Sequence, residues 1–427
     1  MRALPISSTL KSEMISHSTI SMKNRFVLVD YTFTTKLLKQ IDVDPSLPIF
    51  DLNSIAKFAE RSERYQKNDF HIETKEKQLF STYSSGEKKW AFFHYLISND
   101  PKELVLLNPF DSLDTERELR LKSELQKYQN RGSITLISTE VQDCFEQISW
   151  DKIEVFNGQI STPIANIQKL EDYSQTSNLK TFELPLNKFI ANQKDIQTIF
   201  ELKNIQLSYG NEAILNRINW TVEKNNFWQL IGPNGSGKST LLSLVIGDNP
   251  KAYGQDITIF DRPKGSGESV WDIKKKIGYF SPSTILSYPK RKSVFDMICS
   301  GFQDAIGMYR KPSDLEVQST QKWIERMGWN SLQNRYLKHL STGEQRLIMI
   351  IRAMIKHPAL LILDEPAVGL DTQSKSQLHH LINTYVEQSE SAVIYVSHKP
   401  IGELRANDSI VLKKTKSGSI STINPPA

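Results

Sequence analysis

The sequence predicts an α/β fold with a parallel-sheet core, and three observations support this prediction. An apolar stretch at Phe227–Ile231 leads into a glycine-rich turn and then into an apolar-periodic segment that begins at Lys238. A second apolar stretch, Leu360–Leu363, ends at two adjacent carboxylates. Weaker copies of several segments recur between Tyr83 and Thr139. Strands followed by turns and helices are typical of parallel sheets, and the repetition predicts two tandem copies of the fold, the first truncated and degenerate.

The composition limits the number of domains and the classes of function that the chain can have. The chain has 427 residues, enough for two domains, and 39% of them are hydrophobic. The net charge of +5 is spread along the chain, which makes a nucleic-acid partner unlikely. The two cysteines cannot form a disulfide framework or a four-cysteine metal site. No apolar run approaches the roughly 18 residues that a membrane span needs, so we expect a soluble or peripheral protein.

Further elements follow from periodicity and apolar runs. Strands are expected at Ile199–Ser208, Trp220–Glu223 and Ala392–Val396, and helices at Ser293–Gly301, Val317–Met327 and Arg346–Lys356. The segment from 151 to 198 contains turn-forming pairs and little sustained periodicity. We therefore expect a first domain over residues 1–150, a linker over 151–198 and a second domain over 199–427.

The turn before Lys238 has the pattern of a phosphate-binding loop, G-x-x-x-x-G-K-[ST]. Glycines allow the backbone to curl so that successive N–H groups face phosphate oxygens, Lys238 reaches the β- and γ-phosphates, and the Ser239 hydroxyl holds Mg²⁺. An accidental glycine-rich turn is the alternative, and the strand–turn–helix context argues against it. The predicted ligand-contacting residues here are Gly232, Pro233, Asn234, Gly235, Ser236, Gly237, Lys238, Ser239 and Thr240.

Two carboxylates end the strand at Leu360–Leu363. Parallel α/β sheets bind ligands at the carboxyl ends of their strands. Asp364 is suited to hold Mg²⁺, and Glu365 is suited to activate water as a base. The alternative interpretation is an acidic turn after a strand.

Three further positions are ambiguous when taken singly. Ser341, in Leu-Ser-Thr-Gly-Glu-Gln, begins a helix and is either an anion site or a simple helix cap. His398 follows an apolar strand and is either a site residue or an ordinary histidine. Tyr209 follows the strand at Ile199–Ser208 and is either a base-stacking residue or a turn tyrosine.

Taken together, these segments resemble the ATP-binding-cassette (ABC) ATPases. The phosphate loop, the signature at Ser341, the strand ending at Asp364, the Gly-Leu-Asp turn before Thr372 and the histidine follow in the family's order. The segments Gly265–Gly278 and Ser300–Tyr309 are similar to the tandem, soluble ModF-type members, which carry molybdate-transport or photorepair names. The resemblance implies ATP and Mg²⁺ as ligands and ATP hydrolysis as the activity. It also implies catalytic roles for Glu365, His398 and Lys238, metal binding by Ser239 and Asp364, and adenine stacking by Tyr209.

One position departs from the family pattern. Where the family reads I-G-Y-x-x-Q, this chain has Ile277-Gly-Tyr-Phe-Ser-Pro282. Proline has no side-chain amide to contact Mg²⁺ or water. Slow hydrolysis, or a different coupling to a partner, is the expected consequence.

The first half carries degenerate copies of the same segments. Tyr83-Ser-Ser-Gly-Glu-Lys parallels the signature, and alignment places Leu107 opposite Asp364, Asn108 opposite Glu365 and Thr139 opposite His398. Both carboxylates and the histidine are therefore missing. The spacing of the second half places the first phosphate loop before Met1, so we expect a first cassette without this loop; an incomplete gene sequence is the alternative.

The surviving signature suggests one composite site. The family's cassettes act as head-to-tail pairs, so Ser84, Ser85 and Gly86 would close over ATP held by Lys238. A helix cap is the alternative role for these residues. The pairing is either intramolecular or within a homodimer.

Three functions are compatible with these patterns: a soluble ATPase, the energy-coupling subunit of a membrane transporter, and a low-turnover ATP-binding regulator or scaffold. The protein partner, in the membrane or soluble, is unidentified. The first 25 residues are rich in Ser and Thr and weakly resemble a mitochondrial presequence, so a cytoplasmic or a mitochondrial location is expected.

Overall fold

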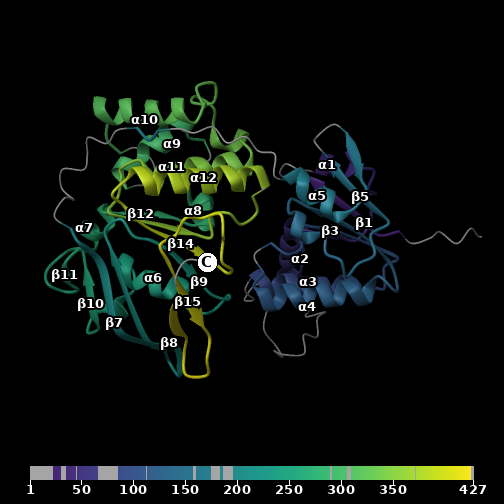
Figure 1. Cartoon of the computed structure of the whole chain (residues 1–427), viewed down its shortest axis with the longest axis horizontal. Helices are drawn as coiled ribbons and strands as arrows, with labels where there is room; N and C mark the ends of the chain where they lie inside the picture. Colours follow the sequence, from purple (N-terminus) through teal and green to yellow (C-terminus); the bar gives the residue numbers. More distant parts are fainter. Residues whose placement is uncertain are drawn as a thin grey trace, which may run out of the picture.

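The computed structural model describes residues 23–29, 35–44, 46–65, 85–111, 113–156, 160–174, 183–185, 196–288, 291–304, 309–370 and 372–424. These residues form three sheets, one from the first half of the chain and two from the second. Figure 1 shows the two halves side by side, the first in purple to blue and the second in teal to yellow.

The first half is a six-stranded sheet with helices on both faces. Its strands are β1 (Arg25–Val29), β2 (Ile49–Phe50), β3 (Glu103–Leu107), β4 (Ser133–Ser138), β5 (Lys152–Phe156) and β6 (Ser161–Ile164). Its helices are α1 (Thr35–Gln40), α2 (Leu52–Tyr65), α3 (Ser85–Ser98), α4 (Thr115–Tyr128) and α5 (Ile167–Ser174). Along β1, Phe26 and Leu28 pack towards α3, α4 and α5, while Val27 and Val29 pack towards α1, because side chains alternate across a strand.

The second half combines a parallel sheet with an antiparallel one. The antiparallel strands are β7 (Thr198–Tyr209), β8 (Glu212–Glu223), β10 (Asp256–Ile259) and β11 (Arg262–Pro263). The other sheet contains β9 (Phe227–Ile231), β12 (Ile277–Phe280), β13 (Leu360–Asp364), β14 (Ala392–Ser397), β15 (Asp408–Lys413) and β16 (Ile420–Asn424). The helices are α6 (Lys238–Ile246), α7 (Val270–Lys275), α8 (Pro282–Ser287), α9 (Val294–Cys299), α10 (Asp314–Arg326), α11 (Thr342–Met354) and α12 (Thr372–Gln388). One core lies between the two sheets around α6, and another lies between the parallel sheet and the helices α9 to α12.

The six-stranded sheets of the two halves have the same layout. Their strand orders are β2-β3-β4-β1-β5-β6 and β12-β13-β14-β9-β15-β16. In each sheet all neighbours are parallel except the last pair. β1 therefore corresponds to β9, β3 to β13 and β4 to β14, which confirms the expected α/β fold and its repetition.

This correspondence corrects one expectation. The counterpart of the phosphate loop lies between β1 and α1, at residues 30–34, and not before Met1. These residues are outside the described part, and their sequence, Asp-Tyr-Thr-Phe-Thr, has no glycine and no lysine. The expected position was wrong because two segments of the first half are shorter than their counterparts. Residues 30–48 separate β1 from β2, whereas 232–276 separate β9 from β12, and residues 51–84 separate β2 from α3, whereas 281–341 separate β12 from α11.

The expected linker also differs from the structure. Residues 152–174 hold β5, β6 and α5, and β5 pairs in parallel with β1. Both strands are short and β6 is largely exposed. Their sequences therefore show no clear alternation of apolar and polar residues from which strands could be predicted. The first unit therefore extends beyond residue 150, at least through α5. Among the described residues, no helix is long and apolar enough to cross a bilayer.

Candidate functional site

The segment after β9 forms a tight loop that leads into α6. Gly235 and Gly237 have φ angles of 75° and 85°, which residues with side chains rarely adopt. A Cβ on Gly237 would also lie 2.9 Å from Cδ2 of Leu215. The predicted segment 232–240 thus has the left-handed turns and the following helix start that phosphate-binding loops require.

Lys238 is a buried cation held at the base of this loop. Its side chain donates hydrogen bonds from Nζ to the carbonyl oxygens of Gly232 (2.6 Å) and Pro233 (3.2 Å). Burial lowers the pKa of Lys238, while the nearby carboxylates of Glu365 and Asp364 act to raise it. The carboxylates supply part of the negative charge that a buried ammonium group requires, and Lys238 adds positive charge to a loop whose geometry suits an anion such as a polyphosphate.

Asp364 ends β13 beside the loop, as predicted. Burial raises its pKa and Lys238 lowers it. The hydroxyl of Tyr279 donates a hydrogen bond of 3.3 Å to Oδ2 of Asp364. Tyr279 was not among the predicted site residues, because its contact with Asp364 joins two neighbouring strands that are far apart in the sequence. A carboxylate kept in a dry site by a lysine and a hydroxyl has the hard oxygen donors that Mg²⁺ prefers.

Glu365 follows Asp364 in a left-handed conformation with φ of 47°. Its backbone N–H donates to the carbonyl oxygen of Val396 at 3.1 Å, which fixes the residue against β14. Burial raises the pKa of Glu365, Lys238 lowers it and Asp364 raises it. A raised pKa makes this carboxylate a better proton acceptor near neutral pH.

His398 lies at the end of β14, near the same lysine. Burial lowers its pKa to about 4, and the positive charges of Lys399 and Lys238 act in the same direction. The acidic residues Glu118 and Asp114 of the first half act against this shift. His398 is therefore a neutral imidazole at physiological pH, able to donate from one ring nitrogen and accept at the other.

Tyr209 ends β7 with 49% of its surface exposed. Its hydroxyl accepts a hydrogen bond of 2.9 Å from Nδ2 of Asn249. The Nζ of Lys251 lies 5.3 Å from the centre of the ring. The ring is thus fixed at its hydroxyl end and accessible, as a base-stacking residue would need to be, and stacking itself stays a prediction.

Pro282 is the first residue of α8, where its fixed φ favours helix initiation. Its side chain offers no hydrogen-bonding group. The hydroxyls of the neighbouring Ser281 and Ser283 bond to each other at 2.8 Å. The described contacts therefore give no substitute for the amide that the family pattern places here.

The two signature segments differ in what the structure describes. Ser341 caps α11 in a reciprocal capping box with Glu344. In the first half, Ser84 lies outside the described residues, and the backbone of Ser85 and Gly86 opens α3. The cap interpretation thus holds for Ser341, while a role for Ser84, Ser85 and Gly86 over the nucleotide stays a prediction.

The first half lacks the acidic groups of the second at the equivalent place. Leu107 ends β3, and Asn108 follows it. Oδ1 of Asn108 accepts from the backbone N–H of Thr139 at 2.9 Å and from the hydroxyl of Ser138 at 3.2 Å. These neutral contacts provide no counterpart of the carboxylates of Asp364 and Glu365.

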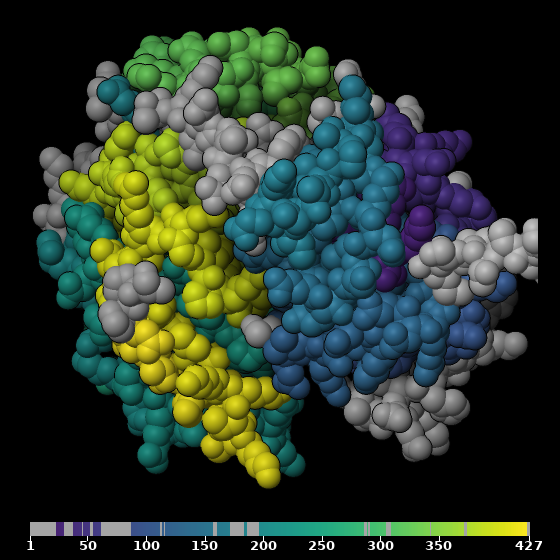
Figure 2. Space-filling model, turned by 45° about the vertical axis from the view of Figure 1, so that its right-hand side comes forward, coloured from purple at the N-terminus to yellow at the C-terminus, as the bar shows by residue number. Residues whose placement is uncertain are grey.

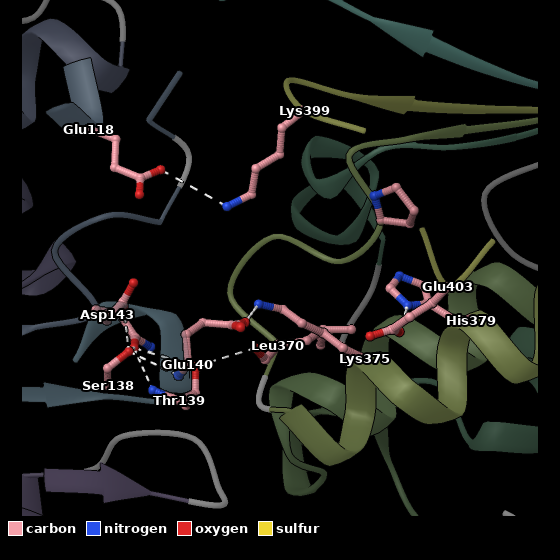
Figure 3. A network of polar contacts seen from close by, with 12 residues as sticks. Glu118, Ser138, Thr139, Glu140, Asp143, Leu370, Lys375, His379, Lys399 and Glu403 are labelled. Carbon is pink, nitrogen blue, oxygen red and sulfur yellow. Dashed lines mark hydrogen bonds and ion pairs between the residues drawn. The ribbon is translucent and has the colours of Figure 1, made fainter. Parts of the chain in front are cut away.

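The two halves touch where their strands end. The hydroxyl of Thr139 donates to the carbonyl oxygen of Leu370 at 3.5 Å (Figure 3). In Figure 2 the blue surface of the first half lies directly against the yellow and yellow-green surface of the second. Asp114, which precedes α4, acts to raise the pKa of Lys238. The sequence reading missed Asp114 as a neighbour of the site.

Comparison with known proteins agrees with this geometry. Residues 215–368 match the ABC transporter family model. The chain is 34% identical over 335 residues to the ABC transporter ATP-binding protein ModF of Escherichia coli, covering 75% of this chain and 67% of that protein. It is 28% identical over 321 residues to the uncharacterized ABC transporter ATP-binding protein C323.04 of Schizosaccharomyces pombe, covering 74% and 64%. The match thus spans about two thirds of the length of each of these relatives.

A solved structure resembles nearly the whole chain. The RNase-L inhibitor covers 93% of this chain and 85% of its own, with a TM-score of 0.60 and 12% identity. At this identity the likeness concerns the fold alone. It agrees with two α/β units in tandem.

Proposed function

Because this chain belongs to the family of ABC transporter ATP-binding proteins, we propose that its second half binds ATP with Mg²⁺ and hydrolyses the terminal phosphoanhydride bond. The observation that best supports this is the grouping of Lys238, Asp364 and Glu365. A buried lysine at a glycine-rich loop, beside two partly buried carboxylates, suits a polyphosphate and a divalent cation.

Each predicted residue then has a distinct task. Ser239 and Asp364 would hold Mg²⁺, which supplies charge neutralisation on the phosphates when bound. Lys238 draws the β- and γ-phosphates to the loop, and Glu365 accepts the proton of the attacking water. His398, neutral because of its burial, orients groups near the terminal phosphate by hydrogen bonds. Tyr209 stacks on the adenine.

The first half completes the site in this proposal. Ser84, Ser85 and Gly86 would close over the nucleotide. Supporting this, the charge of Asp114 acts on both Lys238 and His398, so the first half is within electrostatic reach of the loop. The first half, without its own phosphate loop and carboxylates, would then be a degenerate cassette that assists hydrolysis and does not perform it.

A second candidate is an ATP-binding regulator with low turnover. Pro282 favours this candidate. It stands where the family pattern has a glutamine, and proline has no side-chain amide to contact Mg²⁺ or water. A third candidate, coupling to a membrane protein, follows from the family name alone. Turnover measured with Mg²⁺ distinguishes the second candidate, and co-purification from detergent extracts distinguishes the third.

Binding of Mg·ATP to the Lys238→Ala variant tests the main proposal. We expect affinity to fall at least about 100-fold, since a charge-assisted contact in a desolvated site is lost. Lys203→Ala is the control, because Lys203 is exposed on β7 and its ion pair is with Glu201 of the same strand. Equal affinity in the Lys238→Ala variant and the parent would contradict a nucleotide site at this loop.

A further inference from the structure

Two ion pairs cross the contact between the halves, and they occupy reciprocal positions. Lys375, in α12, pairs with Glu140, which follows β4. The carboxylate of Glu118, in α4, lies 4.0 Å from Nζ of Lys399, which follows β14. Figure 3 shows both pairs bridging from the first half, on the left, to the second half, on the right.

The shared strand order makes these positions equivalent. β4 corresponds to β14, so Glu140 and Lys399 stand at the same place in the two halves. α4 follows β3 as α12 follows β13, and Glu118 stands where Lys375 does. The two ion pairs are therefore one contact formed twice, as expected around an approximate two-fold axis between the halves.

The signs of the charges are exchanged between the halves. The first half contributes two acids, Glu118 and Glu140, and the second contributes two bases, Lys375 and Lys399. We propose that this exchange makes the contact selective: each half accepts the other half and rejects a copy of itself. In a pair of second halves Lys375 would face Lys399 twice, and in a pair of first halves Glu118 would face Glu140 twice. Like charges placed opposite each other disfavour the wrong partner.

A third acid of the first half, Asp111, adds to this exchange of charges between the halves. Asp111, also from the first half, acts to raise the pKa of Lys375 and of the buried Arg346 in the second half. Glu403 is an acid of the second half near Lys375, and its carboxylate contacts Nδ1 of His379 at 2.5 Å. Asp111 is thus a third acid of the first half facing bases of the second, and Glu403 is an exception, an acid on the basic side.

Selection depends on the pairs acting together. The side chain of Lys399 is 51% exposed, and those of Glu118, Lys375 and Glu140 are 19%, 21% and 27% exposed. Partly exposed pairs stabilise little one by one. A wrong pairing, however, loses every attraction and meets repulsion at both positions, whereas the peptide connection raises the effective concentration of the right partner. This inference concerns pairing and does not rest on ATP hydrolysis.

Two double variants of the full-length chain with equal net charge test it. Lys375→Glu with Glu118→Lys places like charges at both contacts between the halves and makes two copies of either half complementary. Lys375→Glu with Glu140→Lys reverses one pair, leaves both contacts between the halves complementary, and also makes two copies of either half complementary. The two variants therefore differ only in the contacts between the halves. At low salt, sedimentation should show the mismatched variant as a dimer, with a dissociation constant at least about tenfold lower than those of the parent and the matched variant.

Amide hydrogen exchange at Thr139 and Leu370 provides a second readout. A dimer, or a loss of exchange protection confined to the mismatched variant, supports the proposal, and about 1 M salt should remove the difference by screening. Equal mass and equal exchange protection in the two variants would overturn it. Because the two variants have the same composition, the matched variant also controls for effects on folding.

Discussion

Glu365 and Asn108 occupy the same position in the two halves and share its unusual backbone. Their φ angles are 47° and 42°. Each donates its backbone N–H to the neighbouring parallel strand, Glu365 to Val396 at 3.1 Å and Asn108 to Ile137 at 2.9 Å. The first half has thus kept the local geometry of the proposed base position, while its side chain is an amide that cannot accept a proton from water at neutral pH.

We expect Glu365→Gln to lower ATP turnover at least about 100-fold, because the general base is lost, while Mg·ATP binding is kept. Asn108→Asp is the matched change in the first half. It should leave turnover within about twofold of the parent, since Leu107 and Thr139 supply neither a metal ligand nor a histidine beside it. Steady-state phosphate release measures both; undiminished turnover in Glu365→Gln would remove this residue from the mechanism.

Adenine stacking makes a separate prediction for Tyr209. Replacing it with alanine should weaken ATP binding about tenfold or more, as loss of aromatic stacking on a base does. Tyr209→Phe should bind ATP nearly as well, because it loses only the hydrogen bond from Asn249. Inorganic tripolyphosphate has no base, so its affinity should be the same in all three proteins. Weakened tripolyphosphate binding in the alanine variant would indicate a damaged loop and not lost stacking.

The sequence predicted the second half well because its signals are local. The strands at Phe227–Ile231 and Ala392–Val396, and the helix start at Lys238, are confirmed. Each combines an apolar run with a nearby turn or glycine signal. Short-range patterns of this kind determine secondary structure with little help from distant residues.

The first half and the contacts between halves could not be read in the same way. Residues 30–34 contain no glycine, so only the strand order indicates that they correspond to the phosphate loop of the second half. The bond from Tyr279 to Asp364 joins residues brought together by neighbouring parallel strands. The pairing of Lys375 with Glu140 joins residues far apart in the chain. No local pattern encodes such contacts.

Two histidines with lowered pKa values, the buried His357 and the partly buried His398, give stability a defined pH dependence. The pKa of His398 and that of His357 are each lowered to about 4, mainly by burial. In the unfolded chain a histidine titrates near 6.5, so between roughly pH 6.5 and 4 the unfolded state binds more protons. The free energy of unfolding should therefore fall as pH drops through this window.

His357→Gln and His398→Gln should each reduce this fall. Relative to the parent, each variant should recover about 2 kcal/mol of the change between pH 7 and pH 5, measured by urea unfolding. Buried carboxylates contribute equally to parent and variant, so the comparison isolates the histidine. His398→Gln alone should also lower ATP turnover. A pH dependence identical to the parent's would show that folding does not lower the pKa of that histidine.

The signature serines provide the test of which half closes the site. Ser84→Ala should lower turnover about 100-fold if its hydroxyl stabilises charge at the terminal phosphate, a loss of about 3 kcal/mol. Ser341→Ala removes the corresponding hydroxyl in the second half. The Ser341→Ala variant should lose about 1 kcal/mol in its free energy of unfolding, because α11 loses its cap, but its turnover should be nearly unchanged. The reason is that residues 30–34, in the place of the other phosphate loop, have no glycine or lysine to hold a nucleotide.

Phosphate release and urea unfolding of the Ser84→Ala and Ser341→Ala variants show which signature serine acts on the nucleotide. The reverse outcome, with low turnover in Ser341→Ala and normal turnover in Ser84→Ala, would mean that a second half is closed by another second half. Lys375 would then have to face Lys399, so this outcome would count against both the composite site and the charge selection between the halves.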